Sequence, residues 1–150
     1  MRINLRNLFP ANPSAYGGFR FVRIATLAFL VVALVRSFIH LFSADGGAQS
    51  IAGVDTSVAG GNNIIAMFHQ WGAIQLVLSL LLFVLFVRYP GLTPLIVLTI
   101  VADPITREIS GQIMPITSSV TPPGAALNAP ALVLLSVLLV LSLLERSRKA

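Results

Sequence analysis

The chain has 150 residues, of which 56% are hydrophobic and only 10% charged, and its mean hydropathy is +0.89. Soluble domains carry about 25% charged residues, so the composition argues against a soluble globular protein. The apolar residues come in long runs, which predicts an all-α integral membrane protein with one transmembrane domain over residues 1–150. The sequence contains no cysteine, which excludes disulfides, thiolate catalysis and cysteine-ligated metal sites.

The formal net charge of +5 has two competing explanations. One is nucleic-acid binding, and the other is basic loops that hold the cytoplasmic ends of membrane spans. The basic residues outside the apolar runs fall where the second explanation requires them, so no nucleic-acid partner is expected.

Four apolar segments approach the length of about 20 residues that a helix needs to cross a bilayer. They cover residues 19–42, 64–87, 92–114 and 130–144. The third is the least hydrophobic, and the fourth is short and can begin near Ala125. The sequence therefore predicts a four-helix bundle in a membrane.

Local signals mark the ends of these helices. Asn62 and Asn63 are expected to cap the second helix, and Asn128 with Pro130 to open the fourth. Residues 88–91, Arg-Tyr-Pro-Gly, predict a tight turn that joins the second and third helices as an antiparallel hairpin.

The basic residues determine the predicted orientation. With four spans, all of those outside the spans or at their ends fall on one side: Arg2, Arg6, Arg20, Arg23, Arg88, Arg146, Arg148 and Lys149. The loops on the other side contain neither lysine nor arginine. The positive-inside rule then places both termini in the cytoplasm.

A cleaved signal peptide is the competing explanation of the first apolar segment. The segment is longer than the apolar stretch of about 7–15 residues in a secretory signal, and it contains Arg36 and His40. We therefore expect a retained first span, in a multi-pass protein of the inner (plasma) membrane.

The segment 102–108, Ala-Asp-Pro-Ile-Thr-Arg-Glu, is the strongest functional clue. It places Asp103, Arg107 and Glu108 inside the third predicted span, where ionisable groups are costly and must pair, face a protein interior or line a wet cavity. Pro104 lacks a backbone N–H and is expected to kink the helix.

The predicted orientation gathers polar residues of three spans between the midplane and the outer surface. They are Arg36, His40, His69, Gln70, Trp71, Gln75, Asp103, Arg107 and Glu108. The inner half is almost purely apolar. The sequence therefore predicts a polar chamber in the outer half of the bundle.

Helical spacing predicts contacts within this chamber. Asp103 and Arg107 are four residues apart, which favours an ion pair, and Gln75 approaches Asp103 if their helices pack through their polar stripes. Glu108 projects about 100 degrees away from Arg107 and is expected to pair with Arg36. Each pair has two explanations, a functional site or a structural link between helices, since buried ion pairs are not dependable stabilisers.

The same residues support two kinds of site. A catalytic site would use Asp103 or Glu108 as acid or base, with His69 as its partner and Arg107 to orient the carboxylate. A ligand-binding site would use Arg36, His40, Gln70, Trp71, Gln75 and Arg107. For the histidines the alternative is a satisfied polar group, and for Trp71 an interfacial anchor. The spacing matches no metal-ligand signature, so neither a metal nor a cofactor is expected.

The layout resembles that of DoxX-like proteins, a group of small bacterial four-helix membrane proteins. The resemblance rests on two features: the polar start of the second helix, residues 62–70, and Arg107 followed by Ser110 and Gly111. His69 and Gln70 stand where that pattern has an arginine, and Asp103 where it has a small residue. The resemblance implies a four-helix fold and supplies no established activity.

Three functions fit these expectations. The first is a non-enzymatic membrane protein whose chamber binds a lipophilic small molecule, a lipid or a partner helix. The second is a membrane isomerase or hydrolase acting on a terpenoid, sterol-like or quinone-like substrate, and the third is a proton-coupled transporter or channel subunit. The first is favoured because the chain has no catalytic signature. Membrane lipids are expected partners, and assembly as a homo-oligomer or within a larger membrane complex is left open.

Overall fold

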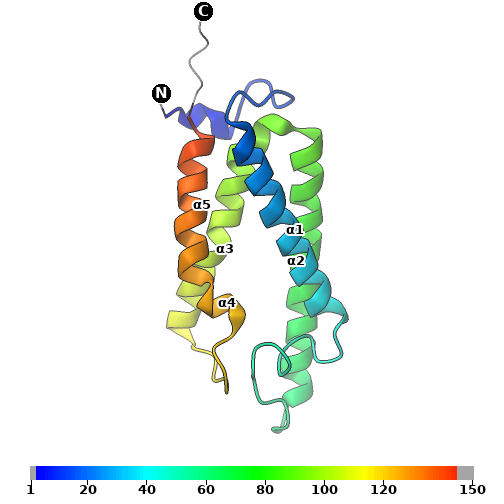
Figure 1. Ribbon diagram of the computed structural model, residues 1–150. Helices are drawn as coiled ribbons and strands as arrows, with labels where there is room; N and C mark the ends of the chain where they lie inside the picture. Colours follow the sequence, from blue (N-terminus) through cyan, green and yellow to red (C-terminus); the bar gives the residue numbers. More distant parts are fainter. Residues whose placement is uncertain (1–2, 145–150) are drawn as a thin grey trace, which may run out of the picture.

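The computed structural model describes residues 3–144 (Figure 1). Its helices are η1 (Leu5–Leu8), α1 (Arg20–Phe42), α2 (Gly61–Arg88), η2 (Pro90–Leu92), α3 (Thr93–Ile113), α4 (Pro123–Ala126) and α5 (Asn128–Ser142). Over this part of the chain the β-structure is limited to one isolated bridge between Ile3 and Leu144. The prediction of an all-α protein is confirmed.

The four long helices begin and end within three residues of the predicted segments, but the predicted N-caps are wrong. The N-cap of α2 is Gly60, which has a φ of 87°, a left-handed conformation that glycine adopts without steric cost. Asn128 is the first residue of α5, as expected, but the N-cap is Leu127, and Oδ1 of Asn128 makes no capping hydrogen bond.

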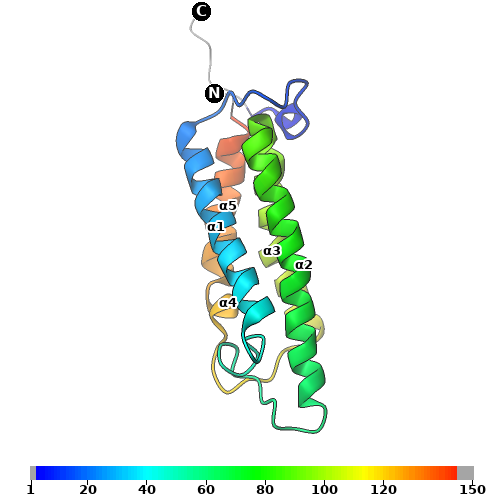
Figure 2. The ribbon, with the colours of Figure 1, turned by 90° about the vertical axis from the view of Figure 1, so that its right-hand side faces the viewer.

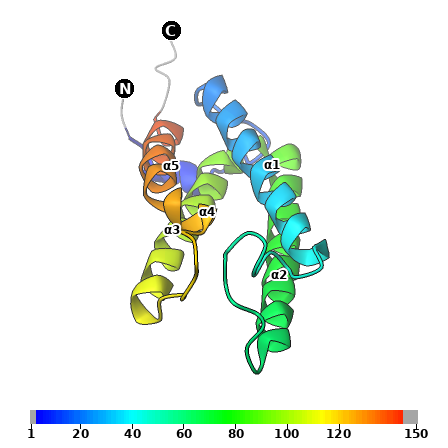
Figure 3. The ribbon, with the colours of Figure 1, turned by 60° about the horizontal axis from the view of Figure 1, so that its bottom comes forward.

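The long helices form two pairs, α1 with α2 and α3 with α5. The predicted hairpin of α2 and α3 is antiparallel as expected, yet each of these helices packs mainly against another partner. Figure 1 shows the pairs close together at the end that carries η1, and Figures 1 and 3 both show them diverging toward α4 and the loop after α1. All four helices run along the long axis of the molecule (Figure 2).

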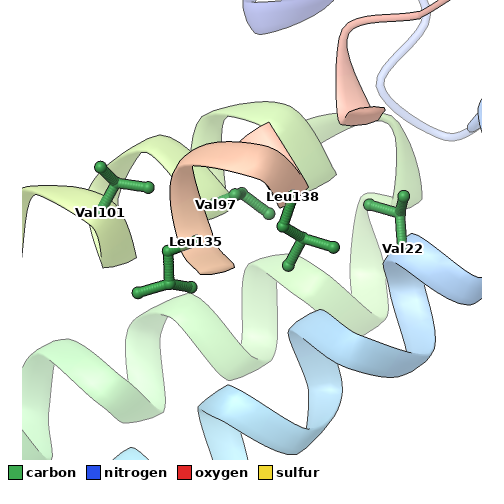
Figure 4. Close-up of a cluster of buried hydrophobic side chains, with 5 residues drawn as sticks. All are labelled: Val22, Val97, Val101, Leu135 and Leu138. Carbon is green, nitrogen blue, oxygen red and sulfur yellow. The ribbon is translucent and has the colours of Figure 1, made fainter. Parts of the chain in front are cut away.

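The apolar core lies toward the end where the pairs converge. One cluster joins α1, α3 and α5 through Val22, Val97, Val101, Leu135 and Leu138 (Figure 4). A second cluster joins α1, α2 and α3 through Leu30, Phe86 and Ile96. Close packing of these side chains stabilises this end of the bundle through van der Waals contacts between the helices.

Arg23 ties α1 to the turn between α2 and α3. Its guanidinium donates to the carbonyl oxygens of Phe86 and Pro90, each at 3.2 Å, and to Oγ1 of Thr93 at 3.1 Å. Its Cζ atom also lies 4.2 Å from the centre of the Phe86 ring. The side chain therefore satisfies carbonyl groups at the C-terminal end of a helix, where they lack helical partners.

Two of the described helices, α1 and α2, are long and apolar enough to cross a membrane. α5 is apolar but has 15 residues, and α3 carries three ionisable side chains along its 21 residues.

Candidate functional site

The site begins with a glutamine that links two charged residues on other helices. Gln75 of α2 accepts a hydrogen bond at Oε1 from Nη2 of Arg36 at 2.7 Å. Its Nε2 donates to Oδ1 of Asp103 at 3.4 Å. The predicted approach of Gln75 to Asp103 is confirmed, and the two bonds fix which side of the amide faces each charge.

The second carboxylate oxygen of Asp103, Oδ2, interacts with two guanidinium groups. Oδ2 forms an ion pair with Arg107, four residues on in α3, as the spacing predicts. Nη2 of Arg36, on α1, lies 3.8 Å from the same Oδ2 atom. These are the two ion pairs within residues 3–144. We call Arg36, Gln75, Asp103 and Arg107 the polar network.

The network is partly open at its surface. The side chains of Arg36, Asp103 and Arg107 are 29%, 40% and 33% exposed. Arg107 also donates from Nη1 to the carbonyl oxygen of Gly124 in α4 at 3.2 Å. The network therefore spans α1, α2, α3 and α4, and so joins the two helix pairs in the region where they diverge.

Trp71 and His40 extend the network toward the loop that follows α1. The Arg36 Cζ atom lies 5.2 Å from the centre of the Trp71 ring, within the range of a cation–π contact. The His40 and Trp71 rings are 4.5 Å apart between centres. Nδ1 of His40 lies 2.7 Å from the carbonyl oxygen of Gly46, and because a carbonyl only accepts, this nitrogen carries the proton.

Close packing of α1 against α2 depends on Gly72, beside Trp71. A Cβ atom at this position would lie 2.7 Å from the backbone nitrogen of Leu41 and 2.8 Å from the carbonyl carbon of His40. The absence of a side chain lets the backbones approach, which brings the rings of His40 and Trp71 into contact.

His69 lies two residues before Trp71 in α2, but its hydrogen-bond partner is outside the polar network. Its Nδ1 is 2.9 Å from the carbonyl oxygen of Leu41, so it also donates to a backbone acceptor near the end of α1. Gln70 is exposed and contributes no hydrogen bond to the polar network.

Glu108 contacts α5, and the predicted pair with Arg36 is wrong. Its Oε2 accepts from Nδ2 of Asn128 at 3.2 Å, and its Oε1 from Nε2 of Gln112 at 3.3 Å. The reason is the pairing of the helices: α3 packs mainly against α5, which Glu108 contacts, while Arg36 on α1 approaches Asp103.

Asn128 makes contacts between α5 and α3 that its position in the sequence does not indicate. The residue is 7% exposed, and Nδ2 also donates to the carbonyl oxygen of Pro104 at 3.1 Å. Its Oδ1 is buried with no hydrogen-bond partner among residues 3–144. Asn128 thus links α5 to the proline turn of α3, and its position before Pro130 gave only a capping signal.

The structure separates the three residues expected for catalysis. Asp103 contacts the two arginines and Gln75, Glu108 contacts Asn128 and Gln112, and His69 contacts the end of α1. No hydrogen bond or ion pair joins these three residues to one another in the described part of the chain. The arrangement offers two cationic groups and a polarised amide beside exposed apolar helices, which suits binding better than proton transfer.

The histidines and acids also lie apart as metal ligands. Within residues 3–144 no three His, Asp or Glu residues come together in a way that could hold a metal ion. Comparison with known proteins adds no assignment: no protein-family model, no curated protein and no solved structure matches this chain.

Proposed function

We propose that the chain is a multi-pass membrane protein of the inner membrane, a bundle of four spans with both termini in the cytoplasm. The exposed surface of its helices supports this proposal. In the most apolar 18-residue stretches of α1 and α2, only 22% and 17% of the residues are buried. A core helix of a soluble protein would be mostly buried, whereas lipid would cover these side chains.

The distribution of basic residues supports the orientation. Arg6, Arg20, Arg23 and Arg88 lie at the end where η1 and η2 are found, and the loops 43–60 and 114–127 contain no lysine or arginine. The other residues counted for this prediction, Arg2, Arg146, Arg148 and Lys149, lie outside the described residues.

The other two proposed spans are α3, which carries charged side chains, and α5, which is short. The charged side chains of α3 contact other parts of the bundle, which is the arrangement expected of ionisable residues in a membrane. α5 is about 22 Å long at 1.5 Å per residue. Since a bilayer core is about 30 Å thick, the turn α4 and local thinning would complete this span.

Helix length gives the depth of the polar network. We call the end of the bundle that carries η1, η2, Arg23 and Arg88 the basic end. Arg36 is thirteen residues from Arg23, and Gln75 is thirteen residues from Arg88. Arg36 and Gln75 therefore each lie about 20 Å from the basic end. This distance exceeds half of a core about 30 Å thick. It therefore supports the proposed position of the network in the outer half of the span.

In this proposed membrane bundle, the polar network binds a lipophilic ligand or lipid. The observation that carries the proposal is that Arg36, Asp103 and Arg107 remain about one-third exposed next to apolar surface. Polar groups at this depth need partners, and a ligand with a polar group and an apolar body would supply them. We further propose a relationship to DoxX-like proteins on the four-helix layout alone.

The topology can be tested by cysteine labelling without first removing native thiols, because the chain has none. Ala59→Cys lies in the first long loop, and Ser14→Cys lies before α1; both positions are exposed. In intact cells a membrane-impermeant maleimide should label the first variant and leave the second unlabelled until the membrane is opened. Equal labelling of both would contradict the proposed orientation.

Ligand binding can be tested by native mass spectrometry of the full chain purified in mild detergent. The wild type should carry a lipophilic molecule that Gln75→Ala loses. Gln70→Ala is the matched control, because this glutamine is on the same helix, exposed and outside the network. A wild-type protein free of bound lipophile, or equal retention by both variants, would contradict the proposed function.

A further inference from the structure

The polar network contains more positive than negative charge. Arg36 and Arg107 share the single carboxylate of Asp103, and both approach the same oxygen atom. Glu108 has its partners on α5 and within α3. Two cations and one anion leave a charge of +1 in the network.

The guanidinium of Arg36 also has donors to spare. Its hydrogen bond to Gln75 and its approach to Asp103 both use Nη2. In residues 3–144, neither Nε nor Nη1 of Arg36 has a hydrogen-bond acceptor, although the group can donate five N–H bonds in a planar fork. This fork matches the oxygens of a carboxylate or phosphate.

The surface beside these donors is apolar. Val32 and Ile39, four residues before and three residues after Arg36, share its side of α1 and are exposed. Trp71 stands next to the Arg36 guanidinium. A charged group that binds the arginine would therefore have apolar side chains alongside it.

We infer that the Arg36–Arg107 pair receives the anionic headgroup, a carboxylate or phosphate, of a membrane amphiphile whose tail lies along α1. The inference rests on the proposed function and specifies its ligand class. One negative charge would neutralise the network, and the spare N–H donors of Arg36 would bind the headgroup oxygens. A neutral lipophile of the same length would leave the charge of the network in place, and a hydroxyl oxygen would accept weaker hydrogen bonds than an anion.

Trp71 provides the readout, because it is the one tryptophan in the chain and touches Arg36. The full chain in zwitterionic phosphatidylcholine nanodiscs would be titrated at pH 9 with oleate, with oleyl alcohol and with sodium acetate. Oleate should change the Trp71 emission saturably, while oleyl alcohol and acetate should not. Saturation by acetate at the same concentrations would contradict an amphiphile, and equal responses to oleate and oleyl alcohol would contradict anion recognition.

Two variants separate charge recognition from a structural role. Arg107→Gln should weaken oleate binding about tenfold by removing a charge-assisted contact, whereas Asp103→Asn should strengthen it by removing the competing anion. Arg88→Gln, an exposed arginine at the basic end, should bind oleate like the wild type. Weaker binding by both network variants would overturn the inference, and circular dichroism would confirm that each is folded. If oleyl alcohol binds as oleate does, the proposed function stands without this inference; if no lipophile binds or co-purifies, both fail.

Discussion

Arg36 and Arg107 come from different helix pairs and meet at one oxygen atom, Oδ2 of Asp103. The apolar clusters hold the pairs together toward the basic end, and this shared carboxylate connects them where they diverge. The polar network therefore has a structural role in addition to the binding role proposed for it. Both roles depend on the balance of charge around Asp103.

Replacing Asp103 by asparagine should destabilise the bundle. The change leaves two guanidiniums without their shared anion, and because these groups are about one-third exposed, we expect a loss of about 1–2 kcal/mol, below the cost for a fully buried pair. Thermal unfolding in micelles, followed by circular dichroism, measures it. The double variant Asp103→Asn/Arg107→Gln restores the charge of +1 and should unfold closer to the wild type. Additive losses in the double variant would contradict this explanation.

Gly72→Ala should separate α1 from α2. The new Cβ would meet the backbone of Leu41 and His40 at 2.7–2.8 Å, so overpacking should cost about 1–3 kcal/mol. It should also shift the emission of Trp71, which packs on His40.

Gly111→Ala is the matched control, because a Cβ there meets no atom within 4 Å. It should leave stability unchanged or raise it by about 0.5–1 kcal/mol through helix propensity. Equal destabilisation by the two substitutions would show that close packing at Gly72 is unimportant.

Asn128→Ala should loosen α5 from α3. It removes the hydrogen bonds to Glu108 and to the Pro104 carbonyl, with an expected loss of about 1–3 kcal/mol of unfolding free energy. Hydrogen exchange of the amides in residues 105–112 should rise. The control Asn62→Ala changes an exposed asparagine and should have little effect; similar losses in both variants would refute the role given to Asn128.

The long apolar runs predicted the long helices, because the length of such a run is a property of the local sequence alone. Spacing likewise predicted the Asp103–Arg107 pair, since residues four apart share one side of a helix. The roles of Arg23, Asn128 and Glu108 could not be predicted in this way. Each depends on which helices pack together, and the pairing of α3 with α5 carries no local signal. For the same reason, the position of Asn128 shortly before Pro130 indicated only a helix cap and not its contacts with α3.

The loop after α1 should respond to acid through Asp45. Hydrogen bonds from the Ser50 amide first, and also from Gly47, Gln49 and the Ser50 hydroxyl, lower the pKa of Asp45 from 3.8 to about 2. A lowered pKa means that this contribution to loop order is complete above about pH 4 and is lost as the pH falls through 2. An NMR titration should show the Asp45 carboxyl and the Ser50 amide changing together near pH 2. A midpoint at or above 3.8 would contradict the hydrogen-bonded loop.

The depth of Trp71 in a bilayer is the most direct test of a polar network in the outer half of a membrane bundle. Seventeen residues separate Trp71 from Arg88, which is about 26 Å of helix and places the ring near the outer edge of the hydrocarbon. In vesicles containing brominated phosphatidylcholines, bromine near the headgroup should quench the emission of Trp71 more than bromine near the chain end. Quenching by neither lipid, or strongest quenching from the chain end, would contradict this placement.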